Sequence, residues 1–109
     1  MHNLESTTRN AVRAIILRDN QLLVQKKNDG SYSIPGGAPN VDETLEQGLI
    51  RECHEEVGTA IKIIRLAHVA DYFKPRKSRP PAIRHHIEFF FLCSVAETYQ
   101  AKNGSHPDK

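Results

Sequence analysis

The sequence has no apolar run long enough to cross a bilayer, and its first ten residues, MHNLESTTRN, contain no apolar signal core. We therefore expect no membrane partner. Cysteine is also scarce, because only Cys53 and Cys93 occur and both lie in apolar-patterned segments. Two such residues are typical of reduced, buried thiols, which suits a cytoplasmic protein.

Internal repeats and low-complexity tracts are missing, and neither sign of charge dominates, since the formal net charge is only +2. Hydrophobic residues make up 39% of the chain and charged residues 26%, which is the balance of a soluble globular protein. The length of 109 residues suits one domain with a core of modest size. We expect a single domain over residues 1–109, with flexible polar ends at residues 1–9 and 100–109.

The hydrophobic pattern predicts a mixed α+β domain in which the elements follow the order β-β-β-α-β-β. The first two strands form a hairpin around Asp19 and Asn20, and the last strand is apolar enough for burial on both faces. The segment KPRKSRPPAIR, residues 74–84, contains three prolines and predicts a loop. The predicted strands span residues 11–17, 21–25, 32–34, 61–73 and 85–95.

A helix is predicted over residues 44–57, because apolar residues recur there in steps of four. Gly58 stands where a glycine that ends a helix is expected. The repeating apolar positions are Leu45, Leu49, Cys53 and Val57.

Three glutamates on this helix, Glu52, Glu55 and Glu56, stand at i, i+3 and i+4 and therefore project from one face. Like charges at this spacing repel by about a few tenths of a kcal/mol per pair. A hard divalent cation such as Mg²⁺ would remove the repulsion, since it prefers carboxylate oxygens and keeps waters that a phosphate can displace. Arg51 can pair with one of the carboxylates. A solvated acidic helix face is the alternative interpretation of the three glutamates taken alone.

A glycine pair, Gly36-Gly37, precedes the helix and lets the backbone turn tightly. A loop that leads into a helix N-terminus is suited to binding phosphate. The pair and the glutamates together indicate a site for a metal ion and a phosphorylated ligand.

The spacing of these residues resembles the Nudix box of the MutT-like pyrophosphohydrolases. The box positions are Gly37, Glu43, Arg51, Glu52, Glu55, Glu56 and Gly58. The apolar strand QLLVQKK and an aromatic residue shortly before IPGG are also similar to the family, and the resemblance in element order runs from about residue 10 to residue 95.

The resemblance implies a Nudix fold, which is an α/β/α sandwich around a mixed sheet with the box as a loop, a helix and a second loop. It also implies Mg²⁺-dependent hydrolysis, with Mn²⁺ as a substitute, of a nucleoside diphosphate linked to another moiety. ADP-ribose-like compounds, nucleotide sugars and nucleoside triphosphates all fit this description, so we expect a nucleotide-type small-molecule substrate. The metal ions would neutralise the pyrophosphate and lower the pKa of bound water.

Site residues follow from the resemblance position by position. Glu52, Glu55 and Glu56 would bind metal, with Gly37 as a backbone position of the metal site. The catalytic residues would be Glu55 as general base, Arg51 as the residue that orients the cluster and Glu43 as support for the loop and helix.

The sequence departs from the family pattern at several positions. Asn40 and Asp42 stand where many members carry Glu and Gly, and Thr59 replaces the usual final aliphatic residue. Members also continue past the last predicted strand with another strand and a long helix, which this sequence lacks. An uncovered apolar face would then remain, and we expect a homodimer that buries the face opposite the box helix.

The candidate substrate-binding residues are Tyr32, Arg76, Lys77 and Glu88. Tyr32 could stack on a base or pack at a strand edge. The basic segment around Arg76 could hold phosphate or could be a solvated loop, and five charges form too small a footprint for us to expect nucleic acid. Glu88 could approach the metal ions or pair with His86.

Two functions from different classes are compatible with the sequence. The first is a metal-dependent Nudix hydrolase acting on a pyrophosphate bond. The second is a non-catalytic Nudix-like module that binds a nucleotide or a protein. All the carboxylates of the box are present, and this favours the enzyme.

Overall fold

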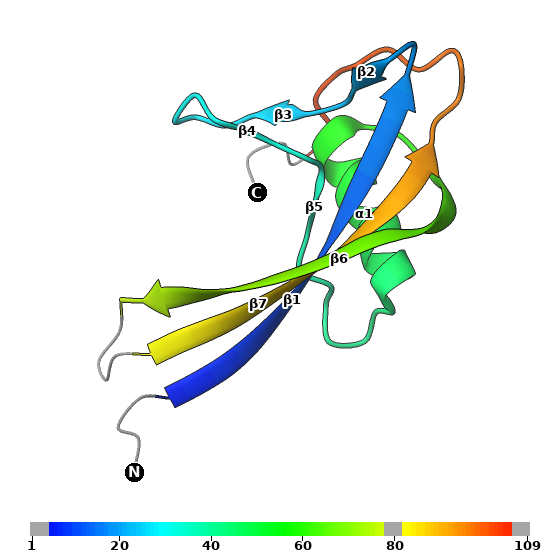
Figure 1. Cartoon of the computed structure of the whole chain (residues 1–109). Coiled ribbons are helices and arrows are strands. Elements are labelled where there is room, and N and C mark those ends of the chain that lie inside the picture. The colour runs from blue at the N-terminus through cyan, green and yellow to red at the C-terminus, as the bar shows by residue number, and fades with distance from the viewer. Residues whose placement is uncertain (1–4, 78–81, 106–109) are drawn as a thin grey trace.

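The computed structural model describes residues 5–77 and 82–105, without the side chains of residues 5 and 6. The described part contains one helix, α1 (Leu45–Val57), and seven strands (Figure 1). The strands are β1 (Glu5–Arg18), β2 (Gln21–Leu22), β3 (Gln25–Lys26), β4 (Tyr32–Ser33), β5 (Gly36–Gly37), β6 (Lys62–Arg76) and β7 (Ala82–Ser94).

The main sheet is mixed and has the strand order β2-β1-β7-β6, with β5 also paired to β1. β1 runs parallel to β7, and β7 runs antiparallel to β6. The pair of β3 and β4 forms a separate two-stranded sheet. The predicted α+β class is confirmed, since a mixed sheet packs against one helix. Of the expected α/β/α sandwich, the described residues contain only one helical layer.

The core lies between α1 and one face of this sheet. Val12, Ala14 and Ile16 alternate along β1 and are almost completely buried, as side chains on one face of a strand should be. They pack with Leu49 and Cys53 of the helix. The face of the sheet that carries these residues is the face that α1 covers.

Both cysteines are free and buried in this core, as the sequence predicts. Burial raises the pKa of the Cys53 thiol to about 12 and that of the Cys93 thiol to about 11. Both groups are therefore protonated at neutral pH and pack as small hydrophobic side chains.

The predicted helix is confirmed, and its ends are fixed by the residues around it. Thr44 Oγ1 accepts a hydrogen bond from Gln47 N at 3.1 Å, while Gln47 Oε1 accepts one from Thr44 N at 2.9 Å. This reciprocal capping satisfies backbone donors at the start of α1. At the other end, Gly58 has φ 71°, a left-handed conformation that glycine adopts without strain.

The predicted hairpin is present, but it is short. Only two residue pairs join β1 to β2, Leu17 with Leu22 and Arg18 with Gln21. Asp19 and Asn20 both have positive φ, which is the geometry of a two-residue type I′ turn. Beyond Leu22 the chain leaves the sheet, and β3 pairs with β4 instead.

The prediction of a loop over residues 74–84 is wrong for most of its length. β6 continues to Arg76 and β7 begins at Ala82, and these two residues are paired. Pairing along the whole length of the two strands outweighs the local preference of the prolines for a loop. Pro75 is tolerated because β6 is an edge strand. Residues 78–81 lie outside the described residues.

The ends of the domain differ from the expectation of flexible ends. Residues 5–9 belong to β1, where they pair with β7 in parallel register. Residues 1–4 and 106–109 are not described. The remaining C-terminal residues, 100–105, contain no strand or helix, but they contact α1.

The molecule is elongated, with extents of 56 × 29 × 27 Å. Figure 1 shows why, because the N-terminal half of β1, the C-terminal half of β6 and the N-terminal half of β7 project beyond α1 as a three-stranded ribbon. We call this ribbon, residues 5–10, 69–76 and 82–88, the distal arm.

The sequence predicted that β7 is buried on both faces, and this is wrong. Phe91 and Cys93 on the helix side are buried, whereas Phe90 and Leu92 on the other side are only half-buried.

No helix in the part of the chain that the structure describes has both the length and the apolar character needed to cross a membrane.

Candidate metal and pyrophosphate site

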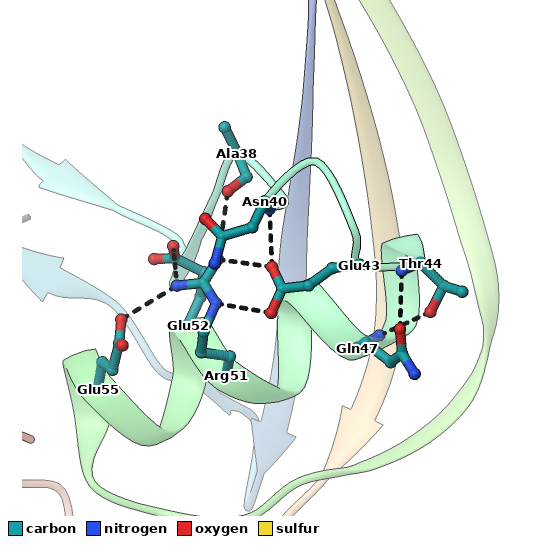
Figure 2. Close-up of polar contacts among 8 residues, drawn as sticks. All are labelled: Ala38, Asn40, Glu43, Thr44, Gln47, Arg51, Glu52 and Glu55. Atoms are coloured by element: carbon teal, nitrogen blue, oxygen red, sulfur yellow. Dashed lines mark hydrogen bonds and ion pairs between the residues drawn. The ribbon is translucent and has the colours of Figure 1, made fainter.

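Arg51 is the centre of a polar network that joins α1 to the loop before it (Figure 2). Its Nε and Nη2 atoms donate to the two carboxylate oxygens of Glu43 at 2.8 and 3.0 Å. Its Nη1 atom donates to Glu52 Oε1 at 2.8 Å and to Glu55 Oε2 at 3.1 Å. The hydrogen bond to Glu43, and after it that to Glu52, raises the pKa of Arg51 above its ordinary value although burial acts the other way. The guanidinium therefore stays charged and fixes three carboxylates.

Glu43 also shapes the loop between the glycine pair and the helix. Its Oε1 atom accepts a hydrogen bond from Asn40 N at 2.7 Å, and its own N–H donates to Asn40 O at 3.0 Å. Glu43 thus connects the loop backbone to Arg51, which is the support role that the resemblance implies for it. Asn40, which departs from the family pattern, takes part in this loop through its backbone N–H and carbonyl.

Two of the glutamates are buried beside the glycine pair. Glu52 is 6% exposed and Glu56 is 1% exposed. The N–H of Gly36 donates to Glu56 Oε1 at 2.8 Å. A Cβ atom on Gly37 would lie 2.9 Å from the Glu52 carboxylate carbon, so only glycine leaves room for that side chain.

Burial raises the pKa of Glu56 to about 7, and the nearby charge of Glu52 adds to the effect while the hydrogen bond from Gly36 opposes it. Two carboxylates that are buried next to each other repel when both are ionised. A cation between or beside them would relieve this repulsion.

The donor set fits a hard divalent cation, since it consists of carboxylate oxygens. Within the described residues, however, no three side chains of His, Cys, Asp or Glu gather closely enough to form a metal site. In Figure 2 the Glu55 carboxylate points to Arg51. A cation held by Glu55 would have to compete with Arg51 for this carboxylate.

The structure does not bring the four candidate substrate-binding residues to this cluster. Glu88 pairs with Arg13, with Oε1 and Nε 3.3 Å apart, and Arg13 also donates to the carbonyl of Ile34 at 3.3 Å. Tyr32 lies in β4 with 65% of its surface exposed. Besides its ion pair with Arg13, Glu88 acts on His86 through its charge, which opposes the lowering of the His86 pKa by burial.

Arg76 and Lys77 lie at the tip of the distal arm. Arg76 pairs with Ala82, which pairs in turn with Glu5 at the start of β1. Gly37 pairs with Val12, seven residues further along β1. At about 3.3 Å per residue, the arm tip is roughly 20 Å from the glycine pair.

Sequence reasoning missed residues that support the site from a distance in the chain. Tyr99 donates from its hydroxyl to the carbonyl of Val57 at 2.6 Å, and the N–H of Gly104 donates to the carbonyl of Glu56 at 2.9 Å. Lys27 lowers the pKa of Glu56 through its charge, although this is a minor effect. The C-terminal segment carries no motif, so nothing in its pattern could have revealed these contacts.

A cavity of about 510 Å³ lies at the other end of the core. Ile16 and Leu23 line it together with Val95 and Tyr99. No box carboxylate is among its lining residues, so the cavity is separate from the glutamate cluster.

The comparisons with known proteins agree with this geometry. The family model described as NUDIX domain matches residues 7–108. An ADP-ribose pyrophosphatase from Methanocaldococcus jannaschii is 37% identical over 89 residues, covering 78% of this chain and 50% of the relative. An RNA pyrophosphohydrolase from Haemophilus influenzae (strain 86-028NP) is 39% identical over 90 residues, covering 73% of this chain and 46% of the relative. The chain thus spans half or less of the length of these curated relatives.

Solved structures share the fold. The MutT NUDIX hydrolase from Burkholderia pseudomallei has a TM-score of 0.74 at 25% identity, over 94% of this chain and 77% of that one. A MutT protein from Methanosarcina mazei Go1 has a TM-score of 0.75 at 22% identity, over 95% of this chain and 75% of that one, and supports the fold alone.

Proposed function

The chain belongs to the NUDIX family, and from this premise we propose that it is a pyrophosphohydrolase that uses Mg²⁺, or Mn²⁺ in its place. Its substrate is a nucleoside diphosphate linked to another moiety, and the bond that breaks is the pyrophosphate bond. The single observation that carries the proposal is the carboxylate cluster of α1, in which Glu52 and Glu56 are buried against the glycine pair and Arg51 fixes its neighbours.

The residues of the cluster have different proposed roles. Glu52, Glu55 and Glu56 would hold the cation, which supplies charge neutralisation of the pyrophosphate and a more acidic bound water. The absence of a side chain at Gly37 leaves room for the Glu52 carboxylate. Arg51 Nη1 donates to both Glu52 and Glu55. If Glu55 turns from Arg51 to the cation, Arg51 would still hold Glu52 in place.

Glu55 is the proposed general base. It is more exposed than the other two glutamates, with 21% of its side chain accessible against 7% for Glu52. A base must reach the proton of an attacking water, and an accessible carboxylate at the edge of the cluster can do so. Release from Arg51 would free the oxygen atom that accepts this proton.

The names of the relatives support a range of substrates. One relative is named ADP-ribose pyrophosphatase and another RNA pyrophosphohydrolase, and both names refer to hydrolysis of a pyrophosphate. ADP-ribose-like compounds, nucleotide sugars and nucleoside triphosphates are therefore the first compounds to test. Glu88 remains a proposed substrate contact, supported by Arg13, which joins it to the carbonyl of Ile34 just before the glycine pair. Tyr32, two residues before Ile34, also remains one, whereas Arg76 and Lys77 would contact substrate only if the distal arm bends or a second copy supplies them.

A panel of these compounds, read by phosphate release after treatment with a phosphatase, tests the proposal. We expect turnover of at least one compound with Mg²⁺ or Mn²⁺ and none in excess chelator. Far-UV circular dichroism should be the same in both conditions, which shows that the chelator removes the metal rather than the fold. Undiminished turnover in chelator would refute a metal-dependent hydrolase, and binding of a nucleotide without turnover would favour a non-catalytic module.

We further propose that the chain forms a homodimer and acts in the cytoplasm without a nucleic-acid partner. The support for the dimer is the exposed apolar surface of β6, where Leu66, Val69 and Phe73 are 48%, 46% and 67% exposed. They pair with Phe91, Phe89 and His85, on the face of the sheet that α1 covers further along, so this surface is not the face opposite α1 that the sequence favoured. A long edge strand of this kind is a site of association.

A further inference from the structure

Residues 96–105, which we call the strap, cross the C-terminal end of α1. The Tyr99 hydroxyl donates to the carbonyl of Val57 at 2.6 Å, and the N–H of Gly104 donates to the carbonyl of Glu56 at 2.9 Å. The last carbonyls of a helix have no partner within the helix itself. The strap supplies two of these partners, and it does so in the turn that carries Glu55 and Glu56.

The strap is also attached to the sheet. Arg18 at the end of β1 donates to the carbonyls of Ala96, Glu97 and Tyr99 at 3.4, 3.2 and 2.6 Å. Tyr99 therefore accepts from the sheet through its backbone and donates to the helix through its side chain. One residue thus ties the end of β1 to the end of α1.

Gly104 lies so close to the helix that a side chain would not fit. A Cβ atom there would be 2.3 Å from the carbonyl oxygen of Glu55 and 2.6 Å from that of His54. Both neighbours are backbone atoms, so neither can rotate away. The approach of the strap to the helix depends on glycine at this position.

Glu56 is consequently held both by its side chain and by its backbone. Its carboxylate accepts from Gly36 in β5, and its backbone carbonyl accepts from Gly104 in the strap. The two contacts come from segments far apart in the sequence, and together they fix where the carboxylate lies relative to the glycine pair. A displaced strap would move the end of the helix and with it the Glu56 carboxylate relative to Gly36.

We propose that the strap positions the carboxylates at the C-terminal end of α1 for metal binding, and that Tyr99 and Gly104 are positioning residues of the site. This inference rests on the proposed function, since it assumes that these carboxylates bind a divalent cation. It adds a second support to the site, at the C-terminal end of the helix, beside the network of Arg51.

The test measures Mn²⁺ binding to the whole chain, without substrate, by electron paramagnetic resonance of the free ion. Tyr99→Phe removes the hydroxyl and keeps the ring, and Gly104→Ala forces the strap away from the helix. Loss of a residue that orients a metal ligand commonly weakens metal binding by about 10- to 100-fold. We expect a loss of at least about tenfold for Gly104→Ala and a smaller loss for Tyr99→Phe.

Matched controls separate positioning from general destabilisation. Gly30→Ala adds the same methyl group, here at a positive φ of 88°, and nothing lies within 4 Å of the added atom. Tyr72→Phe removes a hydroxyl from a tyrosine in the distal arm and keeps its ring stacked on His86. Both controls should bind Mn²⁺ as the parent does, at a temperature well below every melting point.

The outcomes distinguish this inference from the proposed function. A parent that binds no Mn²⁺ would refute the metal-dependent function and the strap inference with it. A parent that binds Mn²⁺, while folded Tyr99→Phe and Gly104→Ala bind it equally well, would refute the strap inference alone. If Gly104→Ala does not fold, an unchanged affinity of Tyr99→Phe is sufficient to overturn the inference. An equal loss in Gly30→Ala would also overturn it, because the effect would then follow stability.

Discussion

The end of the sheet under α1 and the distal arm belong to the same strands, yet they differ in packing. Val12 and Ala14 under the helix are completely buried, whereas Val69 and Phe73 in the arm are 46% and 67% exposed. Hydrogen bonding between the strands continues through both regions. The difference therefore lies in whether a helix covers the face, and the glutamate cluster lies on that covering helix.

The charged side chains differ in the same way. Near α1, Arg51 is bound by three carboxylates at 2.8 to 3.1 Å. In the arm, the His85 ring pairs with Asp71 at 2.8 Å, but 62% of the Asp71 side chain is exposed. Ion pairs in water contribute little, whereas partly buried ones fix geometry. The comparison therefore predicts that substitutions under α1 will lower stability or kcat more than substitutions in the distal arm.

The largest effect should be a loss of stability when a side chain packed between α1 and the sheet is truncated. Leu49→Ala empties a site that is 0% exposed and should lower the free energy of unfolding by about 2–5 kcal/mol. At concentrations where the protein is monomeric, Phe73→Ala in the arm should cost less than about 1 kcal/mol, because most of that side chain is then in water. Urea denaturation followed by circular dichroism measures both. Equal losses would mean that the arm is buried in solution, against another copy or another chain.

The next effect concerns catalysis at the covered end. Glu55→Gln keeps the shape of the side chain and removes a charge and a base, so kcat should fall by at least ~10², which is about 2.7 kcal/mol in the barrier. Glu46→Gln, in the exposed first turn of the same helix, is the control and should keep kcat within about twofold. Steady-state kinetics on whichever substrate the panel reveals will check this. A Glu55→Gln enzyme within a few-fold of the parent would remove Glu55 from both proposed roles.

A smaller effect tests association through β6. Phe73→Ser removes exposed apolar area, and if a second copy covers it the dimer should be at least about tenfold weaker. Ile50→Ser is a matched change on the outer side of α1, where Ile50 is 44% exposed, and should leave association unchanged. Sedimentation at micromolar concentration measures both. A parent that is monomeric throughout this range would overturn the dimer.

The smallest effect is expected at the arm tip. The double substitution Arg76→Gln and Lys77→Gln should leave kcat and KM within about threefold, because the tip is roughly 20 Å from the glycine pair. The same kinetic assay decides this. A tenfold rise in KM with unchanged kcat would restore these residues as phosphate contacts, reached by bending of the arm or supplied by a second copy.

The sequence by itself determined the helix and the residues of the box. The spacing of Glu52, Glu55 and Glu56 places them on one face of any helix, and Thr44 and Gly58 define its ends through contacts within a few residues. The fold class followed from the alternation of strands and one helix. These features are local, and local geometry can be read from spacing alone.

Only the tertiary structure decided which distant segments meet. Glu88 lies beside Arg13, 75 positions away, and Tyr99 reaches Val57, 42 positions away. The extension of β6 and β7 through a proline-rich segment also depends on their pairing with each other and with β1. Such contacts form because the folded sheet brings their partners together, and no periodicity along the chain records which partners those are.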